Sequence, residues 1–287
     1  MIKKYLFCFL FLSLNCFGQS LIPNPPQLTA TSYLLLDAKT LKIISENNAE
    51  QSTGLASITK IMTAYVVADQ IQKGYLSGSS LVKISEKCWR MEGSRMFIKE
   101  GTEVSVSDLM LGIIVQSGND ASCALAEHIA GSEYDFAELM NDYARQMNLE
   151  ETNFMNPTGL PDVNHYSTAE DIAKLSIKLI QDFPETYKIF SQKEFTYNEI
   201  RQLNRNSLLW QDDSIDGIKT GHTSTSGYCM VSSAKRGDMR LIAVTLNSSS
   251  EKSRLRDSRR LLDYGFRYYT TKKIISKYEP ITSVDVW

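Results

Sequence analysis

The sequence lacks an excess of either charge. Its 31 Lys and Arg residues face 33 Asp and Glu residues, which gives a net charge of -2. Such a balance provides no electrostatic reason to expect a nucleic-acid partner or binding to an acidic membrane surface. No internal repeat or low-complexity stretch is present, and 43% of the 287 residues are hydrophobic. This composition excludes a disordered chain and indicates a globular protein.

Cysteine and histidine are scarce as well. Beyond the N-terminal stretch the cysteines are Cys88, Cys123 and Cys229. This odd, small number excludes a disulfide framework, leaves room for one bridge, and favours thiols that fill buried gaps. The histidines are His128, His165 and His222. They are too scattered for their spacing to predict a zinc site.

The N-terminal stretch has the pattern of a secretory leader. Lys3 and Lys4 precede an apolar run over residues 5–14, and a small-residue exit ends at Gly18. A charged start, a short apolar core and such an exit predict an export signal that is cut after Gly18. The run is much shorter than the roughly 20 residues that a membrane span requires. We therefore expect residues 1–18 to be a signal peptide and the mature chain to work outside the cytoplasm.

The rest of the chain shows β-prone runs at both ends and helices between them. A hairpin is predicted over 33–36 and 41–45, and three further strands over 215–221, 227–235 and 239–247. Helical spacing of apolar residues predicts helices over 56–72, 106–115, 121–130, 134–147, 168–182 and 253–268. Because strands and helices do not alternate, we expect an α+β architecture. Its antiparallel sheet is built from both termini, with an inserted helical region packed against it.

A serine and a lysine stand three residues apart in "GLASITKIMTAY", where the first long helix is predicted to begin. Positions i and i+3 share one helix face, so Lys60 can reach the hydroxyl of Ser57. A helix start stabilises negative charge on the serine oxygen, and apolar neighbours make the lysine easier to deprotonate. These are the requirements of a nucleophile with an adjacent base.

The Ser-x-x-Lys spacing by itself proves little. It occurs four times, at Ser57, Ser80, Ser232 and Ser249. For any one match, an exposed or helix-capping serine is the simpler interpretation. Only Ser57 combines apolar surroundings with a helix start.

A second candidate is Ser117-Gly118-Asn119, which lies between two predicted helices. A loop there could present both polar side chains to a cleft. The alternative is an ordinary turn in which Asn119 or Asp120 caps the next helix, and for this segment alone that alternative is favoured.

A third candidate is Lys219-Thr220-Gly221-His222, at the end of a β-run. A cation and a hydroxyl could bind a substrate carboxylate, while glycine lets a substrate backbone approach the strand closely. The alternative is an edge strand with an exposed lysine.

Together the three motifs, in this order, are the set found in penicillin-binding proteins and class A β-lactamases. From about residue 22 to residue 287 the chain resembles the D-alanyl-D-alanine carboxypeptidases, the low-molecular-mass penicillin-binding proteins of serine peptidase family S11. The stretches "GSRMFIKEG", "SGNDAS", "RQLNRNSLLW" and "DGIKTGHTS...GY" carry the resemblance.

The resemblance implies a β-lactamase/transpeptidase-like fold, with a catalytic domain over residues 19–270. It also implies a small C-terminal β domain that ends in an amphipathic membrane anchor. We expect residues 271–287 to be the start of that domain, which is otherwise truncated or absent. Peripheral association with the inner membrane is expected only where such an anchor exists, and the expected location is the periplasm.

The resemblance also implies catalytic roles. Ser57 attacks the carbonyl of the penultimate D-Ala of a peptidoglycan stem peptide, and Lys60 takes its proton. Ser117 relays a proton to the leaving amine, and Asn119 bonds the substrate amide.

Substrate binding is implied for the remaining motif residues. Lys219 and Thr220 hold the terminal carboxylate, next to the close-approach Gly221. The backbone N–H groups of Ser57 and His222 form the oxyanion hole. Arg254 stands where the family carries a carboxylate-binding arginine. The expected partners are stem peptides ending in D-Ala-D-Ala, with β-lactams as inhibitors, and neither a metal nor an organic cofactor is expected.

Other functions use parts of the same pattern. A D,D-endopeptidase would use the same residues. A class A-like β-lactamase is disfavoured because residues 150–170 contain no Glu-x-x-Leu-Asn run. A Ser-His-Asp triad through His222 is a minority interpretation, since no Gly-x-Ser-x-Gly elbow is present. An inactive peptidoglycan-binding module would not need a nucleophile beside its base.

Overall fold

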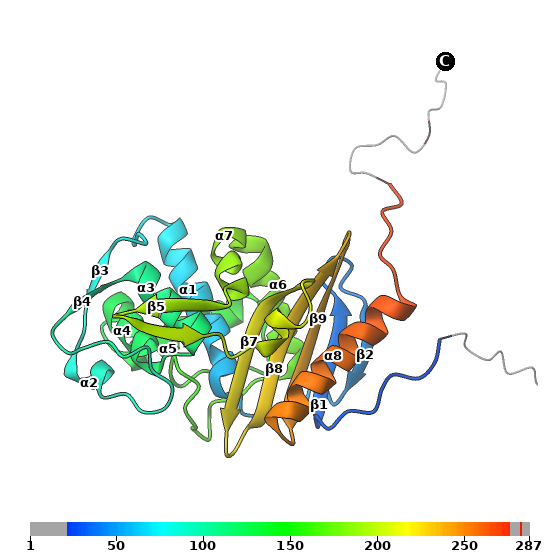
Figure 1. Ribbon diagram of the computed structural model, residues 1–287, viewed down its shortest axis with the longest axis horizontal. Helices are drawn as coiled ribbons and strands as arrows, with labels where there is room; N and C mark the ends of the chain where they lie inside the picture. The colour runs from blue at the N-terminus through cyan, green and yellow to red at the C-terminus, as the bar shows by residue number, and fades with distance from the viewer. Residues whose placement is uncertain (1–21, 276–281, 283–287) are drawn as a thin grey trace, which may run out of the picture.

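The computed structural model describes residues 22–275 and 282 (Figure 1). The predicted leader, residues 1–18, lies outside the described residues, as does most of the predicted start of a second domain. The strands are β1 Ser32–Asp37, β2 Ile43–Asn47, β3 Leu81–Lys83, β4 Glu103–Ser105, β5 Glu194–Tyr197, β6 Ile200–Leu203, β7 Ile215–Thr223, β8 Gly227–Arg236 and β9 Met239–Ser248. The α-helices are α1 Lys60–Gln72, α2 Glu86–Trp89, α3 Val106–Leu111, α4 Asn119–Ala130, α5 Glu133–Gln146, α6 Ala169–Asp182, α7 Pro184–Tyr187 and α8 Glu251–Tyr268. Among the described residues, no helix is both long and apolar enough to cross a membrane.

Five strands form one antiparallel sheet in the order β2-β1-β9-β8-β7. The first two strands come from the N-terminal part of the chain and the other three from its C-terminal part. The helices α1 to α7 lie between these two groups in the sequence. In Figure 1, α1 to α5 lie beside the β7 edge, whereas α6 packs against β9 and β1. The predicted α+β architecture, with a sheet from both termini and an inserted helical region, is confirmed.

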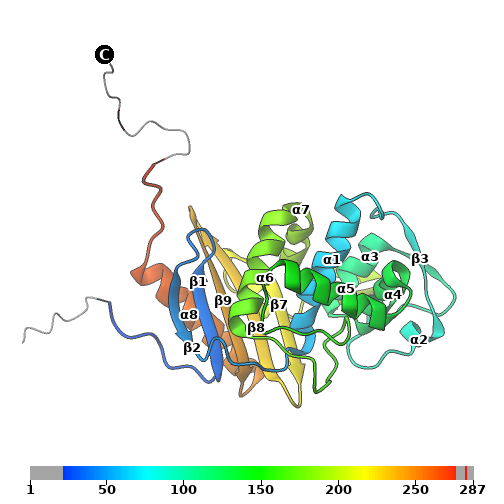
Figure 2. The same cartoon turned by 180° about the vertical axis from the view of Figure 1, so that it is seen from behind.

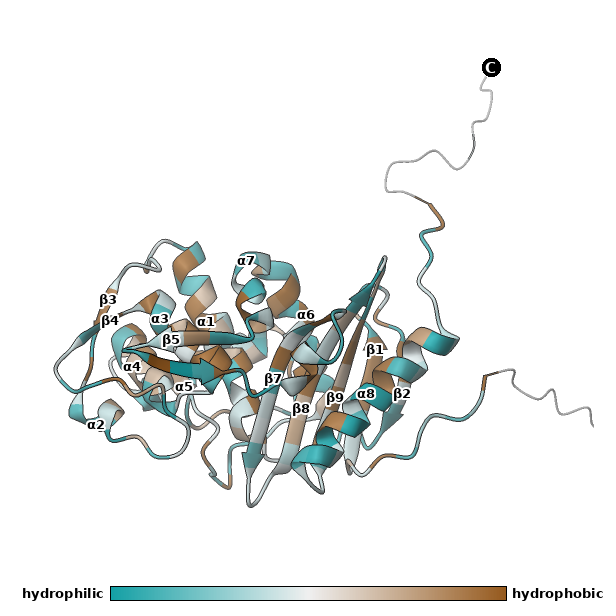
Figure 3. Cartoon of the chain, viewed as in Figure 1, coloured by the Kyte–Doolittle hydropathy of each residue, from teal (hydrophilic) through white to brown (hydrophobic). Residues whose placement is uncertain are grey.

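Successive side chains of the central strands are buried in two different cores, one on each face of the sheet. In β9, Ile242 and Val244 join the large core that is shared with the helical region, whereas Leu241 and Ala243 join a smaller core beneath α8. Successive residues of a strand point to opposite faces, so a strand buried on both faces is apolar throughout. The views from the two sides show α8 on one face and α6 on the other (Figures 1 and 2). Along α8, hydrophobic and hydrophilic residues alternate in the way a half-buried helix requires (Figure 3).

The helix predicted over 56–72 differs from the observed structure at its start. Residues Ala56–Thr59 form a 3₁₀ turn, η1, and the α-helix α1 begins only at Lys60. Every residue of α1 from Lys60 to Ala68 is buried. An all-round buried helix of this kind sits in the centre of the helical region. Ser57 therefore lies in the tighter η1 turn, and Lys60 is the first residue of α1.

The helix predicted over 106–115 is also interrupted. The α-helix α3 ends at Leu111, and Gly112–Gln116 continue as a π-helix, η2. Single π turns of this kind often mark functional sites. The hairpin prediction was displaced by two residues, since β2 covers Ile43–Asn47 and its pairing with β1 contains a bulge. The short hairpins β3–β4 and β5–β6 were not predicted, because strands of three or four residues carry too little apolar alternation.

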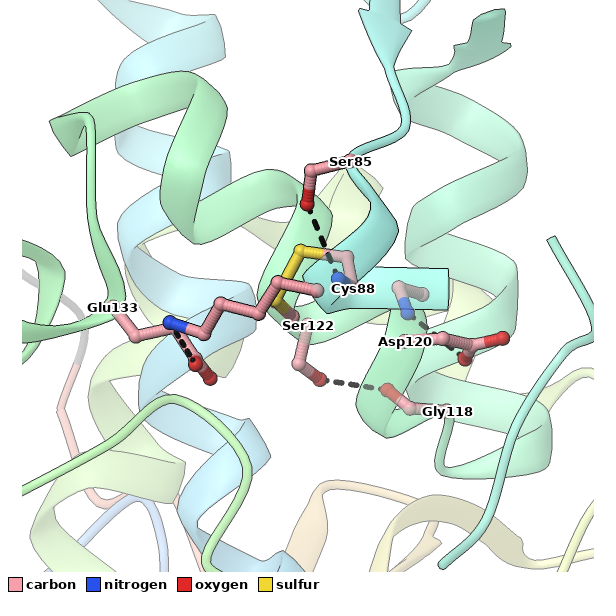
Figure 4. Close-up of a disulfide and its surroundings, with 9 residues drawn as sticks. Ser85, Cys88, Gly118, Asp120, Ser122 and Glu133 are labelled. Carbon is pink, nitrogen blue, oxygen red and sulfur yellow. Dashed lines mark hydrogen bonds and ion pairs between the residues drawn. A yellow bond between two sulfur atoms is a disulfide. The ribbon is translucent and has the colours of Figure 1, made fainter. Parts of the chain in front are cut away.

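The prediction that all three thiols fill buried gaps was wrong for two of them. Cys88 of α2 and Cys123 of α4 form a disulfide with a Cα–Cα distance of 5.3 Å (Figure 4). Cys229 remains a free, buried thiol, and burial raises its pKa to about 11. The bridge ties the four-residue helix α2 to the helix that follows the Ser117-Gly118-Asn119 turn.

Candidate active site

A cavity of about 310 Å³ opens where strand β7 faces the helical region. Its lining residues are Ser57, Ser94, Ser117, Arg205, Thr220, Gly221, His222, Tyr228, Glu251 and Arg254. Six of the nine predicted site residues are therefore in its wall. The other three are Lys60, Asn119 and Lys219, which are all buried. They join the lining through hydrogen bonds, so the fold brings all nine predicted residues into one site.

Lys60 is completely buried and contacts the predicted nucleophile. Its Nζ atom lies 3.0 Å from Ser57 Oγ, 2.7 Å from Asn119 Oδ1 and 2.6 Å from the carbonyl oxygen of Thr158. Burial lowers the pKa of Lys60 to about 7, although the negative charge of Asp120 acts in the opposite direction. Lys60 is thus present partly as the neutral amine at neutral pH.

The three contacts of Lys60 determine where its lone pair points. Two of the acceptors, the amide oxygen of Asn119 and the carbonyl of Thr158, cannot donate a proton. A neutral amine has two N–H bonds, and both are needed to satisfy these buried oxygens. Its lone pair then faces the third contact, the hydroxyl of Ser57. This arrangement is the one that a general base for Ser57 would require.

Asn119 is held in one orientation by the segment that precedes β4. Its Nδ2 donates to the carbonyl of Glu92 at 2.7 Å, which turns Oδ1 toward Lys60. The next residue, Asp120, accepts the backbone N–H groups of Met96 and Phe97 at 3.0 and 2.9 Å. The alternative of a capping Asn119 or Asp120 was wrong, because the N-cap residue of α4 is Gly118. These bonds fix the segment that supplies Ser94 to the cavity.

Ser117 owes its position to the π turn η2. It follows Gln116 with a left-handed φ of 66°, an uncommon conformation for a residue other than glycine. Its Oγ accepts a hydrogen bond from Lys219 Nζ at 2.9 Å. Burial, with the positive charge of Lys60 as the next cause, holds the pKa of Lys219 well below its usual value. Lys219 is therefore not the exposed lysine of an edge strand.

Gly221 lets strand β7 touch the turn that carries the nucleophile. A Cβ atom at this position would lie 3.0 Å from both Leu55 O and Ser57 N. Contacts this short are essentially at the limit for real side chains, so glycine is required for the close approach. The next residue, His222, stacks its ring on Tyr228 with 4.0 Å between the ring centroids. In the described part of the chain, Lys60 is the base that contacts Ser57, which argues against the triad interpretation of His222.

Arg254 of α8 contributes a guanidinium group to the wall of the cavity. Its Nη1 donates to Gly221 O at 3.1 Å and its Nη2 to Glu251 at 3.0 Å, whereas its buried Nε has no partner among the described residues. Burial lowers the pKa of Arg254, but a guanidinium stays charged in proteins. A buried donor on a cation is suited to an anionic ligand.

Four lining residues were not predicted as site residues: Ser94, Arg205, Tyr228 and Glu251. Ser94 and Arg205 occur in "GSRMFIKEG" and "RQLNRNSLLW", stretches that carried the family resemblance. Their motifs were visible, but no chemical requirement assigned them a role. Tyr228 belongs to the "GY" that completes "DGIKTGHTS...GY" in the same resemblance, whereas Glu251 has no such signal, and the packing of β8 and α8 brings both to the cavity. With Arg205 and Arg254 in the wall, cations outnumber acids there, since Glu251 is its one acidic residue.

Comparisons with known proteins agree with this geometry. The family model described as D-alanyl-D-alanine carboxypeptidase, peptidase S11, matches residues 19–250. The chain is 44% identical over 269 residues to D-alanyl-D-alanine carboxypeptidase DacA of Haemophilus influenzae, which covers 92% of this chain and 68% of that protein.

Solved structures share the fold. Penicillin-binding protein 5 from Haemophilus influenzae superposes with a TM-score of 0.83 at 46% identity, over 85% of this chain and 73% of that one. Penicillin-binding protein D2 from Listeria monocytogenes, in its ampicillin-bound form, gives 0.78 at 29% identity, over 85% of this chain and 100% of that one. The β-lactamase/transpeptidase-like fold expected from the motifs is therefore confirmed, and the chain belongs to the D-alanyl-D-alanine carboxypeptidase family, peptidase family S11.

Proposed function

We propose that this chain is a serine carboxypeptidase that removes the terminal D-Ala from peptidoglycan stem peptides, with Ser57 as nucleophile and Lys60 as base. The observation that carries the proposal is the hydrogen bond between Lys60 Nζ and Ser57 Oγ. Both other contacts of Lys60 are carbonyl-type oxygens, so the lone pair of the neutral amine faces the serine hydroxyl.

Acylation uses the residues of the cavity in turn. As Ser57 Oγ bonds to the carbonyl carbon of the penultimate D-Ala, its proton passes to Lys60 Nζ. The backbone N–H groups of Ser57 and His222 stabilise the oxyanion, each by about 3 kcal/mol if they act like other oxyanion-hole donors. The C–N bond then breaks, and the proton of Lys60 passes through the Ser117 hydroxyl to the leaving amine. The products are free D-Ala, an ester on Ser57 and a neutral Lys60.

Deacylation repeats the sequence with water. A water molecule attacks the ester carbon and gives a proton to Lys60, which returns it to Ser57 Oγ as the C–O bond breaks. By the same chemistry, a β-lactam would acylate Ser57, and its ring-opened product would occupy the cavity in place of the peptide. The ampicillin-bound relative supports this expectation.

The cations of the cavity support a substrate with a free carboxylate. Arg205 and Arg254 place two guanidinium groups in the wall of the cavity, and Lys219 supplies a buried donor next to Ser117. We assign the terminal carboxylate to Lys219, Thr220 and Arg254, and the substrate amide to Asn119.

We also propose that the chain works in the periplasm. The leader predicted over residues 1–18 supports export, and the Cys88–Cys123 disulfide suits an oxidising compartment. Peripheral association with the inner membrane would need an anchor beyond the catalytic domain.

The test uses the protein from residue 19 onward, a fluorescent penicillin and the peptide diacetyl-Lys-D-Ala-D-Ala. We expect a covalent label on Ser57 and release of D-Ala, both lost in Ser57→Ala. The matched control is Ser80→Ala, which removes the serine of another Ser-x-x-Lys match and should keep both activities.

Three results would contradict the proposal. Absence of a label would remove the nucleophile assignment. Cleavage of crosslinked peptides into separate stems without release of D-Ala from diacetyl-Lys-D-Ala-D-Ala would indicate the endopeptidase, and rapid turnover of the penicillin would indicate the β-lactamase.

A further inference from the structure

A loop of residues 154–166 presses against the turn that carries Ser57, and we name it the base-holding loop. Thr63 of α1 donates to Pro157 O at 2.7 Å, and Lys60 donates to Thr158 O at 2.6 Å. Gly159 lies so close that a Cβ atom there would be 1.8 Å from the carbonyl oxygen of Ala56. The loop is therefore part of the wall that surrounds the base.

A histidine fixes the far end of the same loop. Nδ1 of His165 accepts the backbone N–H of Met155 at 3.1 Å. That nitrogen must be unprotonated, so the proton of the neutral ring is on Nε2. Nε2 lies 2.7 Å from Thr59 Oγ1 and donates to it. The histidine thus connects the loop to the residue between Ser57 and Lys60.

One side chain closes the turn that aims the Thr158 carbonyl. Oδ1 of Asn156 accepts from Thr158 N at 3.1 Å, Thr158 Oγ1 at 2.8 Å and Gly159 N at 2.7 Å. Its Nδ2 donates to Leu160 O at 3.1 Å. Four hydrogen bonds from one amide leave the segment Asn156–Leu160 little freedom to rotate its peptide groups.

The orientation of Lys60 depends on this turn. If the Thr158 carbonyl turned away, the neutral amine would need only Asn119 Oδ1 as an acceptor. One N–H could then point at Ser57, and the lone pair would no longer be directed at the serine hydroxyl. The turn therefore selects the orientation of Lys60 in which it can act as a base.

We propose that Asn156 is a positioning residue for the general base, acting through the Thr158 carbonyl. The inference rests on the proposed function of Ser57 and Lys60. Asn156 itself contacts neither the nucleophile nor the base. Its effect is expected on the acylation step and on deacylation, since both need the same lone pair.

The test measures the rate of acylation by a fluorescent penicillin, as a function of pH, for three variants. Asn156→Ala removes all four bonds, and we expect at least a tenfold loss of the acylation rate at every pH, because small misplacements of catalytic groups cost up to about 100-fold. Asn156→Asp keeps the oxygen that accepts three bonds and should recover most of the rate above neutral pH. Asn164→Ala, an exposed asparagine of the same loop, is the matched control and should behave as wild type.

The pH profile separates positioning from a general loss of structure. The new carboxylate of Asn156→Asp stabilises the ammonium form of Lys60 and so raises the pKa of Lys60. The pH below which the acylation rate of this variant falls should therefore be higher than in wild type. The titratable groups that already surround Lys60 are Asp120 of α4, Lys219 of β7 and His165 of the loop, and all are unchanged in the variant. Thermal unfolding of each variant checks that the fold is retained.

Wild-type acylation by folded Asn156→Ala would overturn the inference, as would an Asn156→Asp variant no faster than Asn156→Ala. If Asn156→Ala does not fold, the role of Asn156 is decided by Asn156→Asp, through its acylation rate above neutral pH and the shift of its pH profile. The behaviour of wild type shows whether a negative result concerns Asn156 alone or the proposed function as a whole. Release of D-Ala by wild type together with an unaffected Asn156→Ala refutes only the role of Asn156, whereas a wild type that is not acylated refutes the nucleophile itself.

Discussion

Lys219 Nζ lies 2.9 Å from Ser117 Oγ, so the edge strand β7 and the end of the π turn η2 meet across the cleft. Because Lys219 is the donor, the hydroxyl proton of Ser117 is free to point elsewhere. Lys60 and Ser57 form the equivalent pair on the other side, 3.0 Å apart. Each hydroxyl is thus held by a buried lysine, and a reacting group between them has a nucleophile on one side and a proton donor on the other.

The Ser117 hydroxyl gives a prediction about leaving groups. An amide nitrogen must be protonated before it can leave, whereas the oxygen of an ester leaves more easily without a proton. Ser117→Ala should therefore slow hydrolysis of a D-Ala-D-Ala peptide about 100-fold, in the range typical of general acids. Hydrolysis of the matching D-Ala-D-lactate ester should slow much less. Equal losses on the two substrates would show that Ser117 does not deliver the proton.

The pKa of Lys60 gives a prediction about pH. Burial lowers this pKa to about 7, and only the neutral amine has a lone pair for the Ser57 proton. The acylation rate should thus be constant above pH 7 and fall about tenfold for each pH unit below it. His165 has a pKa lowered to about 4 by burial, so it stays neutral through this range. Stopped-flow acylation between pH 5 and 9 measures the profile, and a flat rate down to pH 5 would contradict it.

Arg254 gives a prediction about substrate affinity. A hydrogen bond from a charged group contributes about 1.5–3 kcal/mol, so Arg254→Met should raise KM for the peptide acid roughly 10- to 100-fold, with a smaller change in kcat. The preference for a free carboxylate over a C-terminal amide should shrink by the same factor. Arg256→Met removes a half-exposed arginine from the same helix and should change neither value. An unaltered preference in Arg254→Met would remove this residue from carboxylate binding.

The sequence predicts an interaction well when the two residues are close along the chain, and poorly when they are far apart. The Ser57–Lys60 pair is local, so its spacing and apolar surroundings made it a candidate, which the two other motifs then singled out among the four Ser-x-x-Lys matches. The bond between Lys219 and Ser117 joins residues 102 positions apart, and only the finished sheet brings them together. The role of Asn156 depends on which way a single carbonyl points, which no motif records.

Helical periodicity also has a limit. Apolar residues continue through Gly112–Gln116 with the spacing of a helix, although the hydrogen bonds there have become those of a π turn. The same limit applies to the disulfide, because Cys88 lies in a helix of four residues that is too short for any periodic signal. The motifs therefore predicted which residues meet at the cavity, whereas tertiary packing determined how those residues are held.

Two glycines with left-handed backbones give a prediction about the base-holding loop. Gly159 has a φ of 82° and no room for a Cβ atom beside Ala56, whereas Gly101 has a φ of 73° and nothing within 4 Å. Alanine at either position incurs about 1–2 kcal/mol for the left-handed conformation. Only Gly159→Ala must also displace the loop from the nucleophile's turn. We expect a clearly larger loss of stability and at least a tenfold slower acylation for Gly159→Ala alone, measured by thermal unfolding and penicillin labelling.

The disulfide gives the last prediction. Cys88 and Cys123 are 35 residues apart, and closing a loop of that length in the unfolded chain corresponds to about 4 kcal/mol of stability. The double variant Cys88→Ser/Cys123→Ser should accordingly unfold roughly 8–16 °C below wild type, given the shift of about 2–4 °C per kcal/mol for a chain of this size. A reducing agent should lower the unfolding temperature of wild type by a similar amount and leave that of the double variant unchanged, because its remaining described thiol, Cys229, forms no bridge. If reduction does not lower the unfolding temperature of wild type, the bridge contributes nothing to stability, and hydrogen bonds such as those that Asp120 accepts from Met96 and Phe97 hold the segment that carries Ser94.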